Sequence, residues 1–152
     1  MIAVLQRVTR GKVEVDSREV GSIERGLVVL IGIARGDCER DVLWISKRIA
    51  SLRIFSDDAG KMNLDIQQIR GSILLVSQFT LLADLSSGNR PGFADAEEPE
   101  SARIRCGEVA AQLSQRGIHV AHGEFGAKML VSLENDGPVT IVLDSKSQFQ
   151  SS

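Results

Sequence analysis

Hydrophobic and polar residues alternate along the first third of the chain, as they do in β-strands that bury one face. The segment VEVD at 13–16 alternates residue by residue, and apolar positions mix with polar ones between 2 and 8. We expect Ser17-Arg18 to form a tight turn into a further strand at 20–23. The run LVVLIGI at 27–33 is almost wholly apolar, which predicts a strand covered on both faces.

The period changes to that of a helix after residue 37. One apolar helical face is predicted from the spacing of Val42, Ile45, Ile49 and Leu52. We expect Asp37 to cap this helix, because acidic residues follow in its first turn and basic residues lie near its end. Trp44, the one tryptophan, is expected to pack against the core rather than stack on a ligand.

A second helix is predicted to begin near Pro99, since proline suits the first helical position, and to end at Gly117. Its buried stripe is expected to consist of Ile104, Val109, Ala110 and Leu113. The preceding segment, 85–98, is rich in Ser, Gly, Asn and Pro and therefore predicts a surface loop.

The last third returns to strand character, with strands expected at 119–121, 129–133 and 139–143. The segment NDGP at 135–138 predicts a hairpin turn between the last two. The sum is an α+β fold, a mostly antiparallel sheet or barrel-like domain with two main helices, rather than a βαβ repeat. No linker divides the chain, so we expect one domain at 1–145 and a polar tail at 146–152.

Composition narrows the class of protein. The chain has 152 residues, enough for one hydrophobic core, and its two cysteines, Cys38 and Cys106, indicate free thiols in a reducing compartment. No signal-peptide block opens the chain, and the longest apolar run is too short to span a membrane. We expect a soluble, cytoplasmic protein without a membrane partner. A net charge of −2 disfavours long contacts with an RNA backbone, although a small RNA footprint remains compatible with it.

The familiar catalytic motifs are absent from the sequence: there is no GxSxG, P-loop, GxGxxG or HExxH. His119 and His122 form an HxxH pair, but residues three apart on a strand point to opposite faces. Solvated or packed histidines are therefore favoured over a metal site. A triad built from Ser77 and either histidine has no supporting spacing, so we predict neither a metal nor a cofactor.

Two segments concentrate polar and special-backbone residues. SQFTL at 77–81 follows an apolar strand, and NDGPVT at 135–140 follows another. Each has a purely structural interpretation, the first as a strand leaving the core and the second as a turn. Each could also form a functional site, and both interpretations stay open on the residues alone.

Taken together, SQFTL and NDGPVT resemble the paired signature of the D-aminoacyl-tRNA deacylase family. The opening MIAVLQRVTRGKVEV, RIFSDDAGKMNL at 53–64 and GNRPGF at 88–93 resemble the same family, in the same order. The resemblance runs from Met1 to about Ser145 and departs at Gly92, where the family pattern leads us to expect serine.

The resemblance implies a homodimer with active sites at the subunit interface, acting on the 3′ end of aminoacylated tRNA. It implies that the Gly137-Pro138 bond is cis and that this dipeptide enters the other subunit's active site. The pocket for the terminal adenosine and aminoacyl group would be lined by Ser77, Gln78, Phe79 and Thr80. Arg7 would hold the Gly-Pro loop, and Phe125 and Met129 would form pocket walls.

Ester chemistry agrees with the missing triad. An aminoacyl ester is already labile, and the ribose 2′-hydroxyl can assist attack by water, so the protein needs chiefly to position it and stabilise an oxyanion. Backbone N–H groups near Phe79 and Thr80 are the candidates, with Thr80 as a covalent nucleophile the competing hypothesis. Main chain at Gly137 and Pro138 would reject an L side chain by collision, which predicts that glycyl-tRNA is also cleaved.

Three alternatives remain. A non-catalytic module of the same fold would bind RNA ends or a protein. A general esterase would use Thr80 or Ser77 and cleave simple activated esters. A metal hydrolase built on His119 and His122 would lose activity to a chelator.

Overall fold

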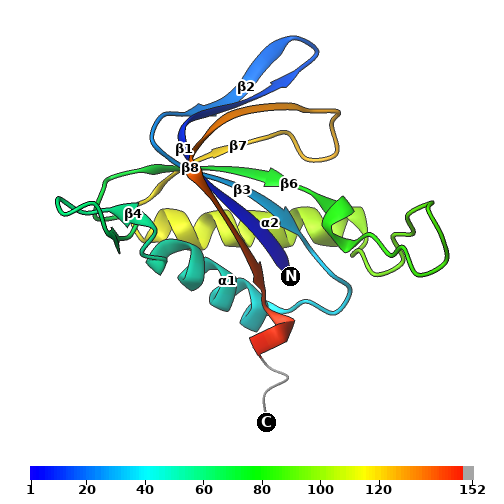
Figure 1. Ribbon diagram of the computed structural model, residues 1–152. Coiled ribbons are helices and arrows are strands. Elements are labelled where there is room, and N and C mark those ends of the chain that lie inside the picture. The colour runs from blue at the N-terminus through cyan, green and yellow to red at the C-terminus, as the bar shows by residue number, and fades with distance from the viewer. Residues whose placement is uncertain (149–152) are drawn as a thin grey trace.

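The centre of the fold is a six-stranded sheet of order β2-β1-β3-β6-β7, in which β8 pairs with the other edge of β1 (Figure 1). The computed structural model describes residues 1–148. The sheet strands are β1 (Ile2–Val15), β2 (Arg18–Ile23), β3 (Gly26–Gly32), β6 (Ser72–Ser77), β7 (His119–His122) and β8 (Leu130–Asp144). A second, two-stranded sheet consists of β4 (Phe55–Ser56) and β5 (Met62–Leu64). The predicted α+β class with two main helices is confirmed.

Both faces of the central strands are buried, as the apolar run at 27–33 predicted. Leu27 and Val29 of β3 face one hydrophobic cluster, together with Ile73 of β6. Val28 and Leu74, the next residues along each strand, face a second cluster. Because successive side chains of a strand point to opposite faces, the sheet contributes to a separate hydrophobic cluster on each face.

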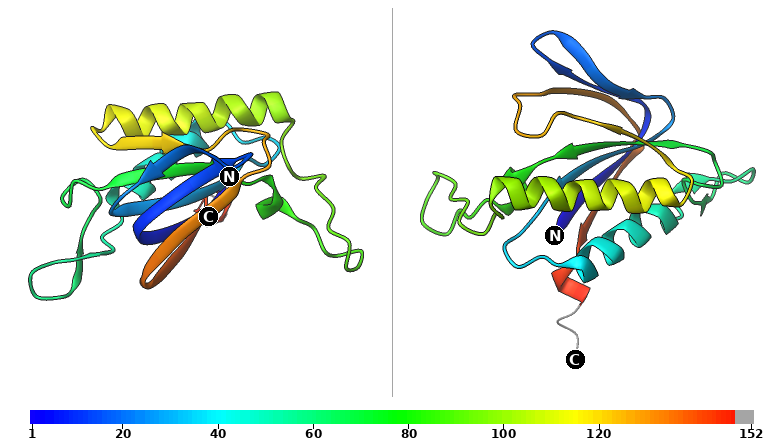
Figure 2. Two further views of the ribbon diagram at one scale, coloured as in Figure 1. Left: turned by 90° about the horizontal axis from the view of Figure 1, so that it is seen from above. Right: turned by 180° about the vertical axis from the view of Figure 1, so that it is seen from behind.

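The helices α1 (Glu39–Ser51) and α2 (Pro99–Gln115) pack side by side over one face of the sheet (Figure 2). Most of the predicted helical positions are confirmed as buried or half-buried, including Trp44, which packs against the first cluster. Ile104 is an exception, because 51% of its surface is exposed. The β1–β2 hairpin and β7 curl over the opposite face, and β2 lies against β7 to give the barrel-like shape (Figure 1).

The sheet is mostly antiparallel, as predicted, but its centre contains two βαβ units. β3 pairs in parallel with β6, and β6 pairs in parallel with β7. α1 lies between β3 and β6 in the chain, and α2 lies between β6 and β7, so each helix forms part of a crossover. Both helices therefore cover the same face, and the carboxyl ends of β3 and β6 meet at one edge.

The predicted hairpin at 135–138 is wrong. β8 is one long strand that pairs with β1 from Ile2↔Asp144 to Glu14↔Leu130. The ladder is interrupted between Gln6↔Thr140 and Val8↔Asn135, where residues 136–139 leave it opposite Arg7. Gly137 and Pro138 thus produce an outward loop, but the strand resumes in its original direction.

Two smaller predictions, the position of the first turn and the N-cap of α1, are wrong by one residue. The first hairpin turns at Asp16-Ser17, both with positive φ, one residue before the predicted turn. Cys38 rather than Asp37 is the N-cap of α1, and the Asp41 side chain accepts the Cys38 backbone N–H. The buried Asp37 carboxylate instead accepts hydrogen bonds from the Met1 amino group at 2.8 Å and the Ala34 N–H at 2.7 Å.

The predicted surface loop at 85–98 extends away from the domain (Figure 2), and most of its side chains are exposed. The first residues of the predicted tail form a short 3₁₀ turn, Lys146–Gln148, and the rest of the tail lies outside the described residues. Across the described part of the chain, no helix is long and apolar enough to cross a membrane.

Candidate functional site

The segment 77–80 lies where β6 leaves the sheet. Ser77 is the last residue of β6, and the Gln78 N–H donates to the Ile31 carbonyl of β3 at 2.7 Å. The chain then forms a 3₁₀ turn, Phe79–Leu82. This turn packs closely on β3 because Gly32 has no side chain: a Cβ there would lie 2.5 Å from a Leu82 methyl group. The sequence therefore brings a polar segment to the carboxyl edge of the sheet, where α/β proteins commonly bind ligands.

A cleft of about 380 Å³ opens beside this segment. Ser77, Gln78 and Phe79 line one side of it, and Phe125 contributes from the loop after β7. The rest of the lining comes mainly from the end of β3 and the segment after it, from the loop 93–98 and from the first turns of α2. Three of the four residues predicted to line a pocket, together with one predicted wall residue, are thus brought together within one chain.

Two aromatic rings lie edge to face at this cleft. The ring centroids of Phe79 and Phe93 are 4.9 Å apart with an interplanar angle of 69°. Phe79 remains 59% exposed, so its ring offers a flat apolar surface to a ligand. Sequence reasoning missed Phe93, although its position in GNRPGF, within a segment that carried the resemblance, could have indicated it.

Thr80 has no activating base among the described residues. Its hydroxyl oxygen accepts a hydrogen bond from the Gln78 side-chain amide, and no carboxylate or imidazole hydrogen-bonds to it there. Cys106 also lines the cleft, but burial raises the pKa of its thiol to about 11, so it is protonated at neutral pH. The cleft therefore presents surfaces and backbone groups rather than an activated nucleophile.

Arg7 lies beneath the loop at 136–139. Its guanidinium donates from Nε to the Asp136 carbonyl at 2.9 Å and from Nη1 to the Ile54 carbonyl at 2.7 Å. The Gly137-Pro138 peptide bond is cis, and Gly137 has a φ of +135°. This φ strains any residue other than glycine, and a Cβ at this position would also lie 2.8 Å from Val139 Cγ2 and 3.0 Å from Arg7 Nη2.

Asn135 holds the other side of the loop. Its side-chain oxygen accepts the Val139 N–H at 2.9 Å, and its side-chain nitrogen donates to the Thr140 hydroxyl at 3.1 Å. Gly137 and Pro138 themselves are exposed. The NDGPVT segment is therefore an outward loop fixed at its base by three side chains of the same chain, with its tip presented to solvent.

Within one chain, this loop does not reach the cleft. Arg7 of β1 lies opposite Leu27 of β3 in the sheet, and Leu27 lies opposite Ile73 of β6. Ser77 is four residues further along β6. Four residues span about 13 Å along a strand, and Arg7 is two strands away from β6, which adds roughly 10 Å sideways. The two motifs thus lie on separate parts of the monomer surface.

Met129 also lies apart from the cleft lining. It is half-buried against the second hydrophobic cluster, and its sulfur would be 2.7 Å from a Cβ at Gly123. His119 and His122, considered above as a metal pair, line two different hollows.

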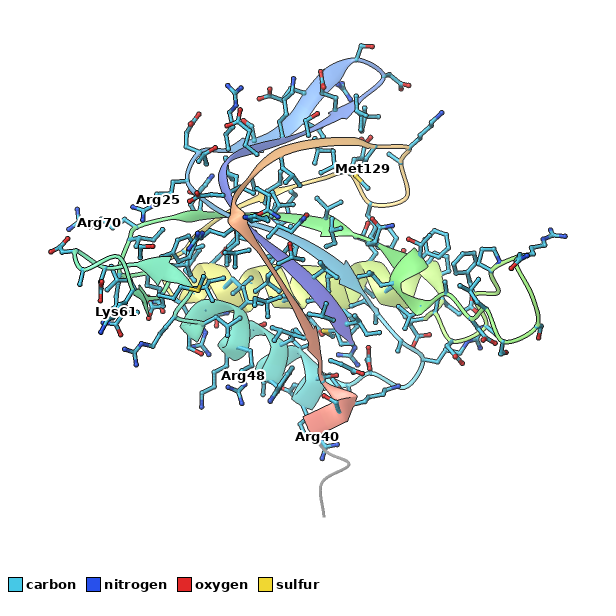
Figure 3. All side chains as sticks on the ribbon, in the orientation of Figure 1. Arg25, Arg40, Arg48, Lys61, Arg70 and Met129 are labelled. Carbon is cyan, nitrogen blue, oxygen red and sulfur yellow. The ribbon has the colours of Figure 1, made fainter. Side chains whose placement is uncertain are left out.

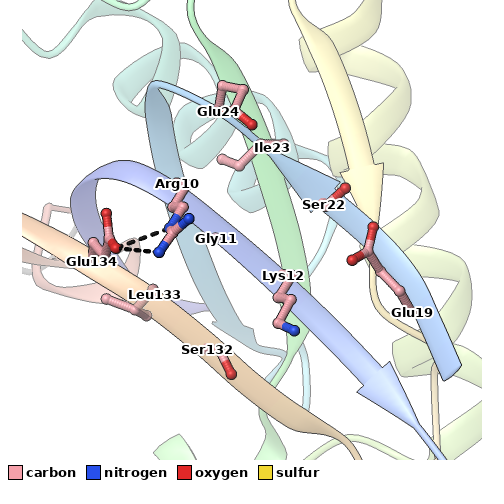
Figure 4. A pocket seen from close by; sticks show the side chains of 10 residues that line it. All are labelled: Arg10, Gly11, Lys12, Glu19, Ser22, Ile23, Glu24, Ser132, Leu133 and Glu134. Atoms are coloured by element: carbon pink, nitrogen blue, oxygen red, sulfur yellow. Dashed lines mark hydrogen bonds and ion pairs between the residues drawn. The ribbon is translucent and has the colours of Figure 1, made fainter. Parts of the chain in front are cut away.

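A larger hollow, of about 540 Å³, lies over β1 between β2 and β8 (Figure 4). Its charges are mixed and partly paired: the Arg10 guanidinium bonds the Glu134 carboxylate at 2.7 Å. Lys12 faces the same hollow, opposite Glu19 and Glu24. None of the predicted site residues lines it, so the 77–80 cleft is the better candidate site.

The fold and cleft define a small α+β domain with an aromatic-lined cleft at the carboxyl edge of its sheet. The family model described as D-Tyr-tRNA(Tyr) deacylase matches residues 4–144. The chain therefore belongs to this family. We accordingly class it among the D-aminoacyl-tRNA deacylases, which are ester hydrolases, and the prediction made from the two motifs is confirmed.

Individual relatives agree. A protein of Anaeromyxobacter dehalogenans (strain 2CP-C) named D-aminoacyl-tRNA deacylase is 50% identical over 98% of this chain and 100% of its own. One of Geobacter sulfurreducens with the same name is 48% identical over 99% of both chains. A solved structure titled c-Myc DNA Unwinding Element Binding Protein is 39% identical, with a TM-score of 0.90 over 95% of this chain and 98% of that one. A structure titled as a probable eukaryotic D-amino acid tRNA deacylase, 16% identical with a TM-score of 0.79, shares the fold.

Arg7→Gln is expected to lower the free energy of unfolding by about 2–4 kcal/mol, because the Asp136 and Ile54 carbonyls both lose their donor. Arg10→Gln, on the same strand, breaks an exposed ion pair and should cost less than about 1 kcal/mol. Urea unfolding at one fixed protein concentration measures both. Equal, small losses for the two variants would contradict the structural role given to Arg7.

Proposed function

We propose that the chain hydrolyses the ester bond of D-aminoacyl-tRNA, releasing a free D-amino acid and tRNA. The observation that carries this proposal is the position of the family's SQFT segment at the mouth of an aromatic cleft. Ser77, Gln78 and Phe79 line that cleft, and Thr80 is tied to Gln78 by a hydrogen bond. The proposed place of action is the cytoplasm, where charged tRNA is found.

The 3′-terminal adenosine is the part of tRNA that fits this cleft. The exposed face of Phe79, supported by Phe93, can stack on the adenine, as aromatic side chains do on unpaired RNA bases. A single-stranded end needs few phosphate contacts. The net charge of −2 is therefore compatible with an RNA substrate.

Hydrolysis proceeds by addition of water to the ester carbonyl and departure of the ribose oxygen, which takes up a proton. The Phe79 and Thr80 N–H groups are the first donors of a 3₁₀ turn and have no carbonyl acceptor within it. In the described residues neither N–H has a backbone acceptor elsewhere. We place the developing oxyanion at these two groups, and assign assistance of the attacking water to the 2′-hydroxyl of the substrate.

A homodimer would complete the site. The Gly137-Pro138 tip is exposed and lies far from its own cleft, so the cleft it enters belongs to a second copy. In the described chain β8 pairs only on its β1 side and exposes Leu130 and Val142, each 65% accessible, which suits an interface between subunits. Main-chain atoms at Gly137 and Pro138 would then face the α-carbon of the substrate.

Such a surface would distinguish D- from L-aminoacyl esters by steric collision. Backbone cannot move aside as a flexible side chain can, so an L side chain directed at it would be rejected, whereas a D side chain would point away. Selection at the α-carbon tolerates different D side chains. Glycine has no side chain to collide with the main chain, so a glycyl ester would not be excluded sterically.

The alternatives make different predictions. A non-catalytic module would bind charged tRNA without cleaving it. An esterase that uses Thr80 or Ser77 would cleave simple activated esters and react with serine-directed inhibitors. The cleft does not favour the esterase, since Thr80 lacks a base among the described residues.

With purified protein and a chelator present, D-tyrosyl-tRNA should be deacylated rapidly and L-tyrosyl-tRNA left intact. Glycyl-tRNA should be cleaved at higher enzyme concentration, because selection depends on a side-chain collision. Release of labelled amino acid measures all three. No release from any substrate would favour the binding module, and complete resistance of glycyl-tRNA would contradict selection by collision.

Thr80→Ala is expected to keep the activity within about tenfold of wild type, because its backbone N–H remains. A D-tyrosyl-tRNA whose terminal ribose lacks the 2′-hydroxyl should lose at least about a hundredfold in rate. Single-turnover deacylation measures both, with Thr9→Ala as the matched control. Complete inactivity of a folded Thr80→Ala, with an acyl-enzyme trapped on wild type, would establish Thr80 as the nucleophile instead.

A further inference from the structure

A basic pocket lies at the end of β6 opposite to the cleft. It has a volume of about 310 Å³ and is formed by the loop before β6, the loop between α2 and β7, and the first residues of these two strands, Ser72 and His119. Arg70, Arg116 and His119 line it, together with the amide side chain of Gln67. That amide donates to the Arg116 carbonyl at 2.9 Å and so ties the two loops together.

The charge of this pocket is positive. No carboxylate lines it, and within residues 1–148 neither Arg70 nor Arg116 forms an ion pair. This contrasts with Arg103 and Arg105 of α2, which bind Glu100 at 2.6 Å and Glu108 at 2.8 Å. The C-terminus of α2 contributes about half a negative charge nearby, which is less than the two whole charges of the arginines.

The loop that carries Arg70 is fixed rather than open. Arg70 has a φ of +53°, a conformation that disfavours residues other than glycine, and its N–H donates to the Gln67 carbonyl at 3.0 Å. The following N–H, of Gly71, donates to the Ile66 carbonyl at 2.9 Å. In Figure 3 the Arg70 side chain extends outward from this end of the sheet, on the same side as Arg25.

We propose that this pocket binds a phosphate group, and, resting on the proposed function, that the group is a phosphodiester of the tRNA whose 3′ end occupies the cleft. Two unpaired arginines, a histidine and an amide are donors suited to phosphate oxygens. β6 separates the pocket from the cleft by five residues, or about 17 Å, and one RNA strand carries several phosphates in that length.

A further hollow adjoins the cleft, beside α2 and β7. Arg103 and His122 line it, and it shares Ser77, Cys106 and Phe125 with the cleft. β7 runs from His119 at the basic pocket to His122 at this hollow. The RNA backbone would pass from one site to the other beside β6 and β7.

The test compares Arg70→Gln/Arg116→Gln with wild type on two substrates, full-length D-tyrosyl-tRNA and D-tyrosyl-adenosine. The double variant should raise KM for the tRNA about tenfold at low salt and leave kcat unchanged, because it weakens only ground-state binding of the RNA backbone. The slope of log(1/KM) against log[salt] should fall in magnitude by roughly 0.7–0.9 for each phosphate that the variant no longer binds. KM for D-tyrosyl-adenosine should not change.

Arg18→Gln/Arg48→Gln removes the same charge from other surfaces and should leave both KM values unchanged. An unchanged KM for tRNA in the Arg70/Arg116 variant would overturn the RNA assignment. Equal increases for both substrates would overturn it as well, since the damage would then reach the cleft itself.

If wild type cleaves neither substrate, the proposed function fails, and the pocket is tested alone with inorganic phosphate. A saturable shift of the His119 NMR signals that is abolished in the Arg70/Arg116 variant would support a phosphate site. No shift would overturn it. Where wild type does cleave the tRNA, phosphate binding together with an unchanged KM for tRNA in the variant would overturn the RNA assignment in favour of free phosphate.

Discussion

The interruption of the β1–β8 ladder places the Gly137-Pro138 loop on the surface, and the proposed two-subunit site depends on it. β8 pairs with β1 over almost its whole length, which fixes the position of every residue on both strands. Residues 136–139 can leave this ladder without collapse because Arg7 satisfies the carbonyls of Asp136 and Ile54 from below. A buried guanidinium with two carbonyl partners thus holds a backbone loop outward, where an unsupported loop of this length would have no fixed direction.

The parallel half of the sheet positions the other motif. Because β3 and β6 are joined through α1 and run in parallel, their carboxyl ends meet at one edge, and Ser77–Thr80 emerge there. The antiparallel half carries the Gly137 loop on a different part of the surface. One chain therefore holds the two motifs on separate surfaces, which is the physical ground for the proposed homodimer.

Much of the fold could be predicted from the sequence, because periodicity reports burial directly. The strand at 27–33, the apolar face of α1 and the start of α2 at Pro99 all follow from local pattern. The direction of the chain after NDGP could not be predicted, since Gly and Pro permit both a hairpin and an outward loop. Pairing of β8 with β1 on both sides of the loop, and the contact with the distant Arg7, decide between them. Phe93 was missed for the same reason: its contact with Phe79 joins two loops through tertiary packing.

The most direct test of the proposed cross-subunit site mixes two inactive variants, Gln78→Ala in the cleft and Gly137→Val in the loop. Both are first shown to be folded, dimeric and inactive alone, and are then unfolded and refolded together in equal amounts. If each site combines the cleft of one subunit with the loop of the other, about one quarter of the sites regain both intact parts, and D-tyrosyl-tRNA deacylation returns to that level. Mixed dimers that form but stay inactive would contradict the cross-subunit site.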